Sequence, residues 1–308
     1  MNICPITYEQ IENGKYSQSG IKLLSPKFTF FSDLNYSKEE QLLEAAARST
    51  KLSIQGVQPK LSAKISTKNN NFELVDSGGT FILKPQNYLF PELPENEDLT
   101  MRLAKQIGLN IPLHGLIYSK DESLTYFIKR FDRYGKNLKL SLEDFAQLAG
   151  KNRDTKYRYS MEKVVKIIDQ NCTFPVIEKL KLFKLTIFNF IIGNEDMHLK
   201  NFSLITKNGK VELSPHYDLL NTSIAIKNVE EEIALPINGK KKKLTKEIFV
   251  DYFATEILEL NSKIISQTLE QIYSSKNSWL KTIEVSFLSN QMKEKYILLF
   301  SERWKIIF

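Results

Sequence analysis

A short segment near the middle of the chain concentrates acidic, basic and amide side chains. It follows an apolar stretch and reads Gly193-Asn194-Glu195-Asp196-Met197-His198-Leu199-Lys200-Asn201. Asn201 stands five positions after Asp196, and a further carboxylate follows in Tyr217-Asp218-Leu219. This order suits phosphoryl transfer, in which one carboxylate orients a hydroxyl while amide and carboxylate oxygens hold Mg²⁺ against phosphate oxygens. The pattern predicts Asp196 as the catalytic residue and Asn201 and Asp218 as metal ligands.

Two basic side chains of the same segment have less specific interpretations. Lys200 could offset the charge that develops on a transferred phosphoryl group. His198 could do the same, although we favour a role in which its ring braces the loop. The segment also has a purely structural alternative, because Asp and Asn commonly close turns between elements.

A lysine and a glutamate further upstream fit the same kind of site. Lys84 ends the run Thr80-Phe81-Ile82-Leu83-Lys84, which is rich in β-branched and aromatic residues and predicts a strand. In kinase-like sites such a lysine contacts nucleotide phosphates and pairs with a glutamate of the following helix. Glu97 is the candidate partner here, and a solvent-exposed lysine at a strand end is the alternative.

Two further segments could contact a nucleotide. A loop ahead of the strands matches neither a Walker sequence nor the kinase glycine triad, yet its residues are expected to cradle phosphates: Ser53, Ile54, Gln55, Gly56, Val57 and Gln58. The segment from Lys129 to Phe131 would form a hinge beside adenine. Arg130 and Arg133 are expected to form structural ion pairs instead.

The elements that must position these residues divide the chain into a sheet-rich part and a helical part. Alternating apolar residues between Leu61 and Arg130 predict antiparallel strands, interrupted by one helix over 95–107 that ends at Gly108. Helical periodicity predicts further helices over 37–48, 142–149, 161–169, 176–192 and most of 245–308. The sequence therefore predicts an α+β, two-lobed, protein-kinase-like fold with a mixed, sheet-rich N-lobe (1–130) and an all-helical C-lobe (131–308).

Composition narrows the function classes. The 308 residues include 43 Lys+Arg and 36 Asp+Glu, and the net charge of +7 is spread along the chain. It suits phosphate-bearing ligands, and we expect no direct nucleic-acid binding. Two cysteines and three histidines without metal-like spacing argue against a disulfide scaffold or a zinc site. Because no run is apolar enough to span a membrane, we expect a cytoplasmic protein. The charge runs 230–232 and 240–243 bracket an apolar segment and predict an exposed hairpin or loop.

Taken together, the motifs resemble those of HipA-like bacterial toxin kinases. The resemblance rests on Ser-Ile-Gln-Gly-Val-Gln-Pro-Lys, Lys-Arg-Phe-Asp-Arg, Gly-Asn-Glu-Asp-Met-His-Leu-Lys-Asn-Phe-Ser and Tyr-Asp-Leu, in the same order from about Ser49 to Asn221. Longer HipA proteins carry an additional N-terminal subdomain ahead of the glycine loop, which here starts near residue 53. Among subfamilies the sequence most resembles HipT, the short kinase of three-gene HipBST toxin–antitoxin systems.

This resemblance implies a serine/threonine protein kinase that uses ATP and Mg²⁺. It implies the following roles: Asp196 in catalysis, Asn201 and Asp218 as Mg²⁺ ligands, Lys84 on the ATP phosphates, Phe131 in the adenine pocket and Ser53 as the autophosphorylation site. Some relatives have two serines in the loop, whereas here Gln55 follows Ser53 and leaves one hydroxyl. A phosphoserine beside the ATP phosphates would repel nucleotide, so we expect self-phosphorylation to inhibit.

The resemblance also implies partners. These are a HipS-like small antitoxin, a HipB-like DNA-binding protein, and an aminoacyl-tRNA synthetase as substrate, tryptophanyl-tRNA synthetase for HipT, whose phosphorylation inhibits translation. Two other function classes remain open from the residues alone. One is a small-molecule phosphotransferase, because related lobes use the same Asp and Asn spacing. The other is an ATP-binding regulatory scaffold without turnover.

Overall fold

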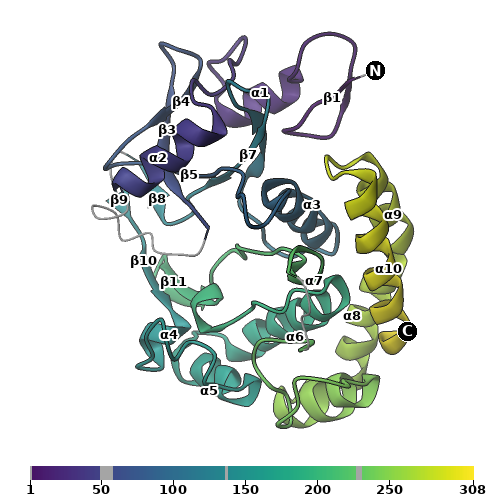
Figure 1. The fold of residues 1–308 in the computed structure, drawn as a ribbon. Coiled ribbons are helices and arrows are strands. Elements are labelled where there is room, and N and C mark those ends of the chain that lie inside the picture. Colours follow the sequence, from purple (N-terminus) through teal and green to yellow (C-terminus); the bar gives the residue numbers. More distant parts are fainter. Residues whose placement is uncertain (1, 49–57, 136–137, 227–230) are drawn as a thin grey trace. The chain divides into compact units, whose positions relative to one another are not determined.

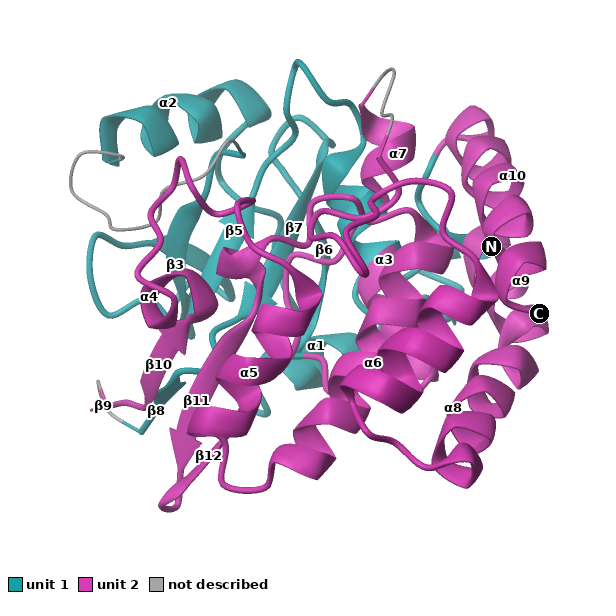
Figure 2. Cartoon of the chain, turned by 90° about the horizontal axis from the view of Figure 1, so that it is seen from below, with its two compact units in different colours: residues 1–99, 112–137, 285–288 teal, residues 100–111, 138–284, 289–308 magenta. Residues whose placement is uncertain are grey.

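The chain divides into two compact units, which are described here separately. The computed structural model describes residues 2–48, 58–135, 138–226 and 231–308. Unit 1 holds residues 1–99, 112–137 and 285–288, and unit 2 holds residues 100–111, 138–284 and 289–308 (Figure 2). The boundary expected after residue 130 stays a prediction, and unit 2 includes residues 100–111.

Unit 1 is built around an antiparallel sheet. Its strands lie in the order β4-β3-β5-β7-β6, and every neighbouring pair is antiparallel (Figure 1). The elements of the unit are β1 (Asn2–Ile3), β2 (Gln10–Ile11), α1 (Gln18–Leu24), α2 (Lys38–Arg48), β3 (Leu61–Ser66), β4 (Asn71–Leu74), β5 (Phe81–Lys84), β6 (His114–Tyr118), β7 (Leu124–Lys129) and β8 (Arg133–Tyr134). Helix α3 (Leu93–Gln106) begins in this unit and ends in unit 2.

The two faces of this sheet have different contents. One face carries the hydrophobic core of the unit, to which Leu61, Phe81, Leu83 and Phe127 contribute together with buried residues of α1. Lys84 lies opposite Tyr126 on the neighbouring strand, while Leu83 lies opposite Phe127. Because successive side chains of a strand point to opposite faces, Lys84 and Tyr126 share the face away from that core.

Unit 2 is mainly helical. Its elements are β9 (Leu138–Lys139), β10 (Ser141–Asp144), α4 (Phe145–Leu148), α5 (Met161–Asn171), α6 (Pro175–Ile192), η1 (Leu199–Asn201), β11 (Ser203–Lys207), β12 (Lys210–Leu213), α7 (Thr222–Ala225), η2 (Ile248–Ile257), α8 (Ser262–Ser274), α9 (Lys276–Val285) and α10 (Asn290–Ile307). Helix α6 is the most deeply buried of them, and it packs against α5 and α10. Its sequence explains both ends, since Pro175 occupies the first turn and Gly193 follows the last one with φ of 71°.

A small sheet in unit 2 corrects the expectation of an all-helical second part. Strands β10, β11 and β12 pair antiparallel in that order. The turn between β11 and β12 is Asn208-Gly209, and both residues have positive φ, as the tight turn of a hairpin requires. The helix expected over 142–149 is wrong in its first part, because 141–144 pair with β11 and only Phe145–Leu148 are helical.

The segment between the two charge runs is a hairpin in the part that the structure describes. Ile237 and Lys240 form a bridge around the turn at Asn238 and Gly239. The apolar residues Ile233, Leu235 and Ile237 are buried, whereas Lys240 is exposed. None of the described helices is long and apolar enough to cross a membrane.

Candidate functional site

The candidate residues of unit 1 centre on a buried ion pair. The Nζ atom of Lys84 lies 2.6 Å from Oε1 and 2.8 Å from Oε2 of Glu97, and both side chains are at most 2% exposed. The lysine comes from the end of β5 and the glutamate from the first turns of α3. The ammonium group also lies 5.6 Å from the ring centre of Tyr126. The expected pairing of Lys84 with Glu97 is therefore present, and this geometry fixes the lysine side chain at one place on the sheet.

Two neighbouring acidic residues of α3 were not singled out from the sequence. Asp98 binds Nδ1 of His114 at 2.9 Å, and both side chains are buried. Glu95 is buried as well, with 6% of its surface exposed. The signal that could have found them is the run Glu95-Asn96-Glu97-Asp98, which places polar residues on every side of a helix start. Such a run cannot all face solvent once the helix packs on a sheet.

In unit 2, two asparagine side chains hold the backbone of Asp196. The Oδ1 atom of Asn194 accepts a hydrogen bond from the Asp196 N–H at 3.2 Å. The Nδ2 atom of Asn201 donates to the Asp196 carbonyl at 2.8 Å, and the N–H of His198 donates to the same carbonyl at 2.8 Å. The five-residue spacing of Asp196 and Asn201 thus closes a compact loop, and the Asp196 carboxylate projects from a backbone that is held on both sides.

The side chain of Asp196 contacts an aromatic hydroxyl. Tyr157 donates its hydroxyl hydrogen to Oδ1 of Asp196, and the tyrosine is 41% exposed. Burial raises the pKa of Tyr157, and its hydrogen bond to the Asp196 carboxylate raises it further. The Asp196 carboxylate is 42% exposed. One oxygen of the Asp196 carboxylate therefore already accepts a hydrogen bond from within the chain.

His198 lies beside this carboxylate and is 5% exposed. Its Nε2 atom lies 2.5 Å from Nζ of Lys156 and 3.8 Å from Oδ1 of Asp196. Burial lowers the pKa of His198; the charge of Asp196 opposes this effect, Lys156 adds to it, and Asp218 opposes it. The lowered pKa favours the neutral ring, whose unprotonated Nε2 would accept a hydrogen bond from Nζ of Lys156. This arrangement supports the bracing role that we favoured for His198.

Asp218 has an unusual backbone conformation. Its φ is 54°, in the left-handed region that residues with a side chain seldom adopt. The preceding Tyr217 donates its hydroxyl to the Lys200 carbonyl at 3.0 Å and lies 2.5 Å from Oγ of Ser203. The charge of Asp218, like that of Asp196, raises the pKa of His198 against the effect of burial. Backbone strain of this kind is often found at functional sites.

Lys200 and the expected hinge have contacts that limit their roles. Lys200 forms an ion pair with Asp144 at 2.8 Å and is 41% exposed. In unit 1, the N–H of Lys129 donates to Leu113 and the N–H of Arg130 donates to Thr80, both at 2.8 Å. Sheet bonding therefore already uses these two backbone donors of the hinge.

The other residues expected at the hinge are described by the structure, whereas most of the glycine loop is not. Arg130 and Arg133 both bind Asp132, at 2.8 and 3.1 Å, as expected of structural ion pairs. Phe131 is half-buried beside them. Gln58 is half-buried as well. The glycine-loop residues Ser53, Ile54, Gln55, Gly56 and Val57 lie outside the described residues.

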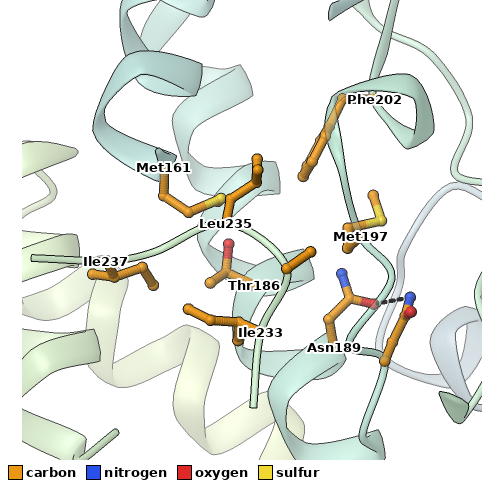
Figure 3. A pocket seen from close by; sticks show the side chains of 10 residues that line it. Met161, Thr186, Asn189, Met197, Phe202, Ile233, Leu235 and Ile237 are labelled. Carbon is orange, nitrogen blue, oxygen red and sulfur yellow. Dashed lines mark hydrogen bonds between the residues drawn. The ribbon is translucent and has the colours of Figure 1, made fainter. Parts of the chain in front are cut away.

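A small cavity is lined in part by Asn194 and Met197, which lie on either side of Asp196 in the sequence, and Figure 3 shows its lining side chains. Its volume is about 20 Å³, and its walls combine apolar side chains with Thr186, Asn189 and Asn194. The Nδ2 atom of Asn194 donates to Oδ1 of Asn189 at 3.0 Å. A cavity of this size accommodates one water molecule and no larger ligand. Its significance is structural, because the same Asn194 that lines it also binds the Asp196 amide.

Among residues 2–48, 58–135, 138–226 and 231–308, no group of three or more His, Cys, Asp or Glu side chains is arranged to hold a metal. The expected ligands Asn201 and Asp218 are a different set, with one amide oxygen and one carboxylate. Hard oxygen donors of this kind are those that Mg²⁺ uses, together with water and phosphate oxygens.

A buried strand lysine paired with a helix glutamate, together with a loop that sets Asn five residues after Asp, defines the class of proteins with a kinase-like fold. The chain belongs to the family of the HipA-like C-terminal domain, whose family model matches residues 52–279. The matched range includes every candidate residue described above. Membership confirms the HipA-like resemblance at the level of the family.

Similar proteins carry kinase names. A Haemophilus influenzae protein provisionally named a kinase is 31% identical over 72% of this chain and 69% of its own length. The Shewanella oneidensis serine/threonine-protein kinase toxin HipA is 29% identical over 62% of this chain and 47% of its own length. A Sinorhizobium fredii protein, also provisionally named a kinase, is 32% identical over 76% of this chain. The chain spans 60% of that Sinorhizobium relative and less than half of the Shewanella one.

Two solved structures share the fold. One is Shewanella oneidensis HipA in a complex with HipB and its operator DNA, with a TM-score of 0.69 and 20% identity over 90% of this chain and 72% of that chain. The other is the Helicobacter pylori proinflammatory kinase CtkA, with a TM-score of 0.56 and 20% identity over 83% of this chain and 91% of that chain. At this identity the likeness concerns the fold, and it confirms the predicted α+β kinase-like class.

Proposed function

We propose that this chain is an ATP-dependent serine/threonine protein kinase of the toxin type. The observation that carries the proposal is the double hold on Asp196 by Asn194 and Asn201. These two contacts fix the backbone from which the Asp196 carboxylate projects. Asn201, which makes one of them, is also a proposed metal ligand. The kinase names of the relatives support the reaction class.

The proposed reaction transfers the γ-phosphoryl group of ATP to a serine or threonine hydroxyl. The hydroxyl oxygen attacks the γ-phosphorus and forms a new P–O bond, while the bond to the β,γ-bridging oxygen breaks and ADP leaves. Asp196 orients the hydroxyl and accepts its proton. The hydroxyl of Tyr157 donates to Oδ1 of Asp196, so the acceptor hydroxyl would use the other carboxylate oxygen or displace the tyrosine.

Asn201 and Asp218 would hold Mg²⁺, which supplies charge neutralisation at the phosphate oxygens when it is bound. One contact of Asn201 supports this proposal. Because Asn201 donates through Nδ2 to the Asp196 carbonyl, its amide oxygen faces away from that carbonyl. The two proposed ligands are hard oxygen donors, as Mg²⁺ prefers.

In unit 1, Lys84 would contact the ATP phosphates and Phe131 would contribute to the adenine pocket. The support for Lys84 is its burial and the contact with Glu97, which hold the ammonium group in one orientation. The glycine loop would cover the phosphates and carry Ser53 as the site of self-phosphorylation. A phosphate there adds about −1.5 to −2 charge, so phosphorylated protein should bind ATP more weakly.

The finer identity that we propose is a HipT-like toxin. Its substrate would be an aminoacyl-tRNA synthetase, with tryptophanyl-tRNA synthetase as the specific candidate, and its phosphorylation would inhibit translation. A HipS-like small protein and a HipB-like DNA-binding protein would be its partners. The Shewanella oneidensis HipA structure with HipB and operator DNA supports the second of these partners.

Phosphate mapping by mass spectrometry tests this function. The protein is incubated with Mg-ATP and a bacterial lysate, alongside an Asp218→Asn variant as control. Phosphate on Ser53 and on a tRNA synthetase, absent with the variant, is the expected result. Phosphate on small molecules alone would indicate a small-molecule phosphotransferase instead. ATP binding without any transfer would indicate a regulatory scaffold.

A further inference from the structure

A pocket of about 440 Å³ lies within unit 1, apart from the residues assigned to phosphoryl transfer. Its walls come from the start of α2, the segment between β5 and α3, the first turns of α3 and the turn between β6 and β7. The lining residues are Lys38, Gln86, Asn87, Tyr88, Pro91, Glu92, Glu95, Glu122, Ser123 and Leu124. A volume of this size is typical of sites for small organic ligands, which occupy roughly 300–1,000 Å³.

The lining of this pocket contains a buried carboxylate oxygen without a partner. Glu95 is 6% exposed, and its Oε1 accepts a hydrogen bond from Nε2 of Gln86 at 2.7 Å. Its Oε2 is buried and has no hydrogen-bond partner among the described residues. Gln86 is held in turn, because the same amide donates to the Leu124 carbonyl at 3.0 Å. Burying a polar group unpaired costs about 1–3 kcal/mol, so the structure retains a carboxylate at a position where an apolar residue would be more stable.

The other charges of the lining favour a cation. Glu92 and Glu122 line the pocket with Glu95, and Lys38 is the one basic residue of the lining. Burial raises the pKa of Glu95 to about 7, and the nearby charges of Glu92 and Asp98 act in the same direction. A bound cation would lower the pKa of Glu95 again, because it stabilises the ionised carboxylate against burial and against the neighbouring negative charges. Glu122 is already paired with Lys15 at 2.7 Å, so the carboxylates that complement a cation are Glu95 and Glu92 beside Lys38.

The rim adds an aromatic surface. Tyr88 is 65% exposed, and its hydroxyl donates to Oε1 of Glu39 at 2.6 Å, which fixes the direction of the ring. The ammonium group of Lys38 already lies 5.6 Å from the centre of this ring. An exposed aromatic ring that is held by its hydroxyl can stack with a flat cation.

We propose that this pocket binds a small organic cation that carries a guanidinium group, with Glu95 as its anchor. A guanidinium group is flat and presents several N–H donors in one plane, so it can donate to the Glu95 carboxylate while its face contacts an aromatic ring. A compact ammonium group lacks that face. The site is distinct from the proposed phosphoryl transfer and rests on unit 1 alone.

Isothermal titration calorimetry of the full chain with n-butylguanidinium tests the proposal. The neutral isostere n-butylurea is the matched ligand, and Glu95→Gln is the matched variant, because it keeps the shape and the bond from Gln86. Glu73→Gln, which alters an exposed carboxylate of the same unit, is the control variant. Thermal melting establishes that each variant is folded.

The expected result has three parts. Butylguanidinium binds the wild-type chain and Glu73→Gln equally, butylurea binds at least tenfold more weakly, and Glu95→Gln loses at least tenfold in affinity for butylguanidinium. Affinity of the wild type should also rise between pH 6 and 8 as Glu95 ionises, with Glu92, Glu122, Asp98 and Lys38 as the surrounding charges. Equal binding of the two ligands, no binding of either, or unchanged affinity in folded Glu95→Gln would overturn the proposal.

Discussion

The Nζ atom of Lys84 lies 2.6 Å from Oε1 of Glu97, and both side chains are almost completely buried. Removing one member of such a pair leaves the other charge buried without its counter-ion, which costs about 3–5 kcal/mol. We therefore expect Lys84→Met and Glu97→Gln each to lower the free energy of unfolding by roughly this amount. Urea denaturation measures the change.

The double variant separates stability from function. With both charges removed, the loss should be clearly smaller than the sum of the two single losses, because no uncompensated charge remains. ATP binding, in contrast, should stay lost, since the double variant has no lysine to contact the phosphates. Additive stability losses would contradict a coupled pair, and normal ATP affinity in the double variant would contradict the role of Lys84.

Gly193 should tolerate no side chain. A Cβ there would lie 2.7 Å from Oγ of Ser223 and would overlap with Leu299, at a φ of 71°. The left-handed backbone costs a non-glycine residue about 1–2 kcal/mol, and overpacking adds about 1–3 kcal/mol. Gly193→Ala should therefore be destabilised by about 2–5 kcal/mol and should displace the loop with Asp196.

Gly209→Ala is the matched control for Gly193. Gly209 has a similar φ of 73°, yet nothing lies within 4 Å of a Cβ there. It should cost only the backbone term of about 1–2 kcal/mol. Equal losses for the two variants in chemical denaturation would mean that crowding at Gly193 is unimportant.

His216 should make the protein less stable in acid. Burial lowers the pKa of His216 to about 4, while the unfolded chain has a pKa near 6.5. The contribution of His216 to the free energy of unfolding is complete above pH 6.5. It is lost as the pH falls toward 4, because the unfolded state then binds a proton that the folded state does not. Between pH 7.5 and 5 the wild type should lose about 2 kcal/mol from this group.

The variant His216→Gln isolates that effect. It cannot take up the proton, so its free energy of unfolding should fall by about 2 kcal/mol less than that of the wild type over the same range. Denaturant unfolding at pH 7.5, 6.5, 5.5 and 5 provides the comparison. Parallel pH dependences of the two proteins would show that His216 titrates normally in the folded state.

Glu95 should have the opposite pH dependence. Its pKa is raised to about 7 by burial, so the folded state binds its proton more tightly than the unfolded state does. The contribution of Glu95 to the free energy of unfolding is therefore complete below about pH 4.5, and it is lost as the pH rises through 7. Glu95→Gln should therefore be more stable than the wild type by up to about 3 kcal/mol at pH 8, and the difference should close toward pH 4.5.

Local patterns in the sequence predicted the parts of the fold that depend on neighbouring residues. The ends of α6, the pairing of Lys84 with Glu97 and the positive φ of Gly108 all follow from local order and residue type. The strand over 141–144 was missed because its partner lies more than fifty residues later in the chain, beyond the reach of periodicity. Two local signals were nevertheless present. These are the Asn208-Gly209 turn and the capping box that begins α4 at Asp144.

In the candidate site too, some features follow from local sequence and others depend on distant partners. The alternative that Asp196 and Asn201 close a turn agrees with the bond from Asn201 to the Asp196 carbonyl, whereas the contacts of Asn194 and Tyr157 could not be read from any spacing. Lys200 binds Asp144, which is fifty-six positions away in the sequence, and its expected role near phosphate stays a prediction. The side-chain partners of a loop depend on the packing around it, so they could not be derived from the loop alone.

The most direct measurement follows the two ends of ATP separately. The protein is incubated with Mg²⁺ and with ATP labelled in either its γ-phosphate or its α-phosphate, and label on protein is counted for the wild type and Asp196→Asn. The account predicts γ-label on protein, reduced by about a hundredfold or more in the variant, and no α-label. Transfer of α-label, or no transfer of γ-label despite ATP binding, would contradict it.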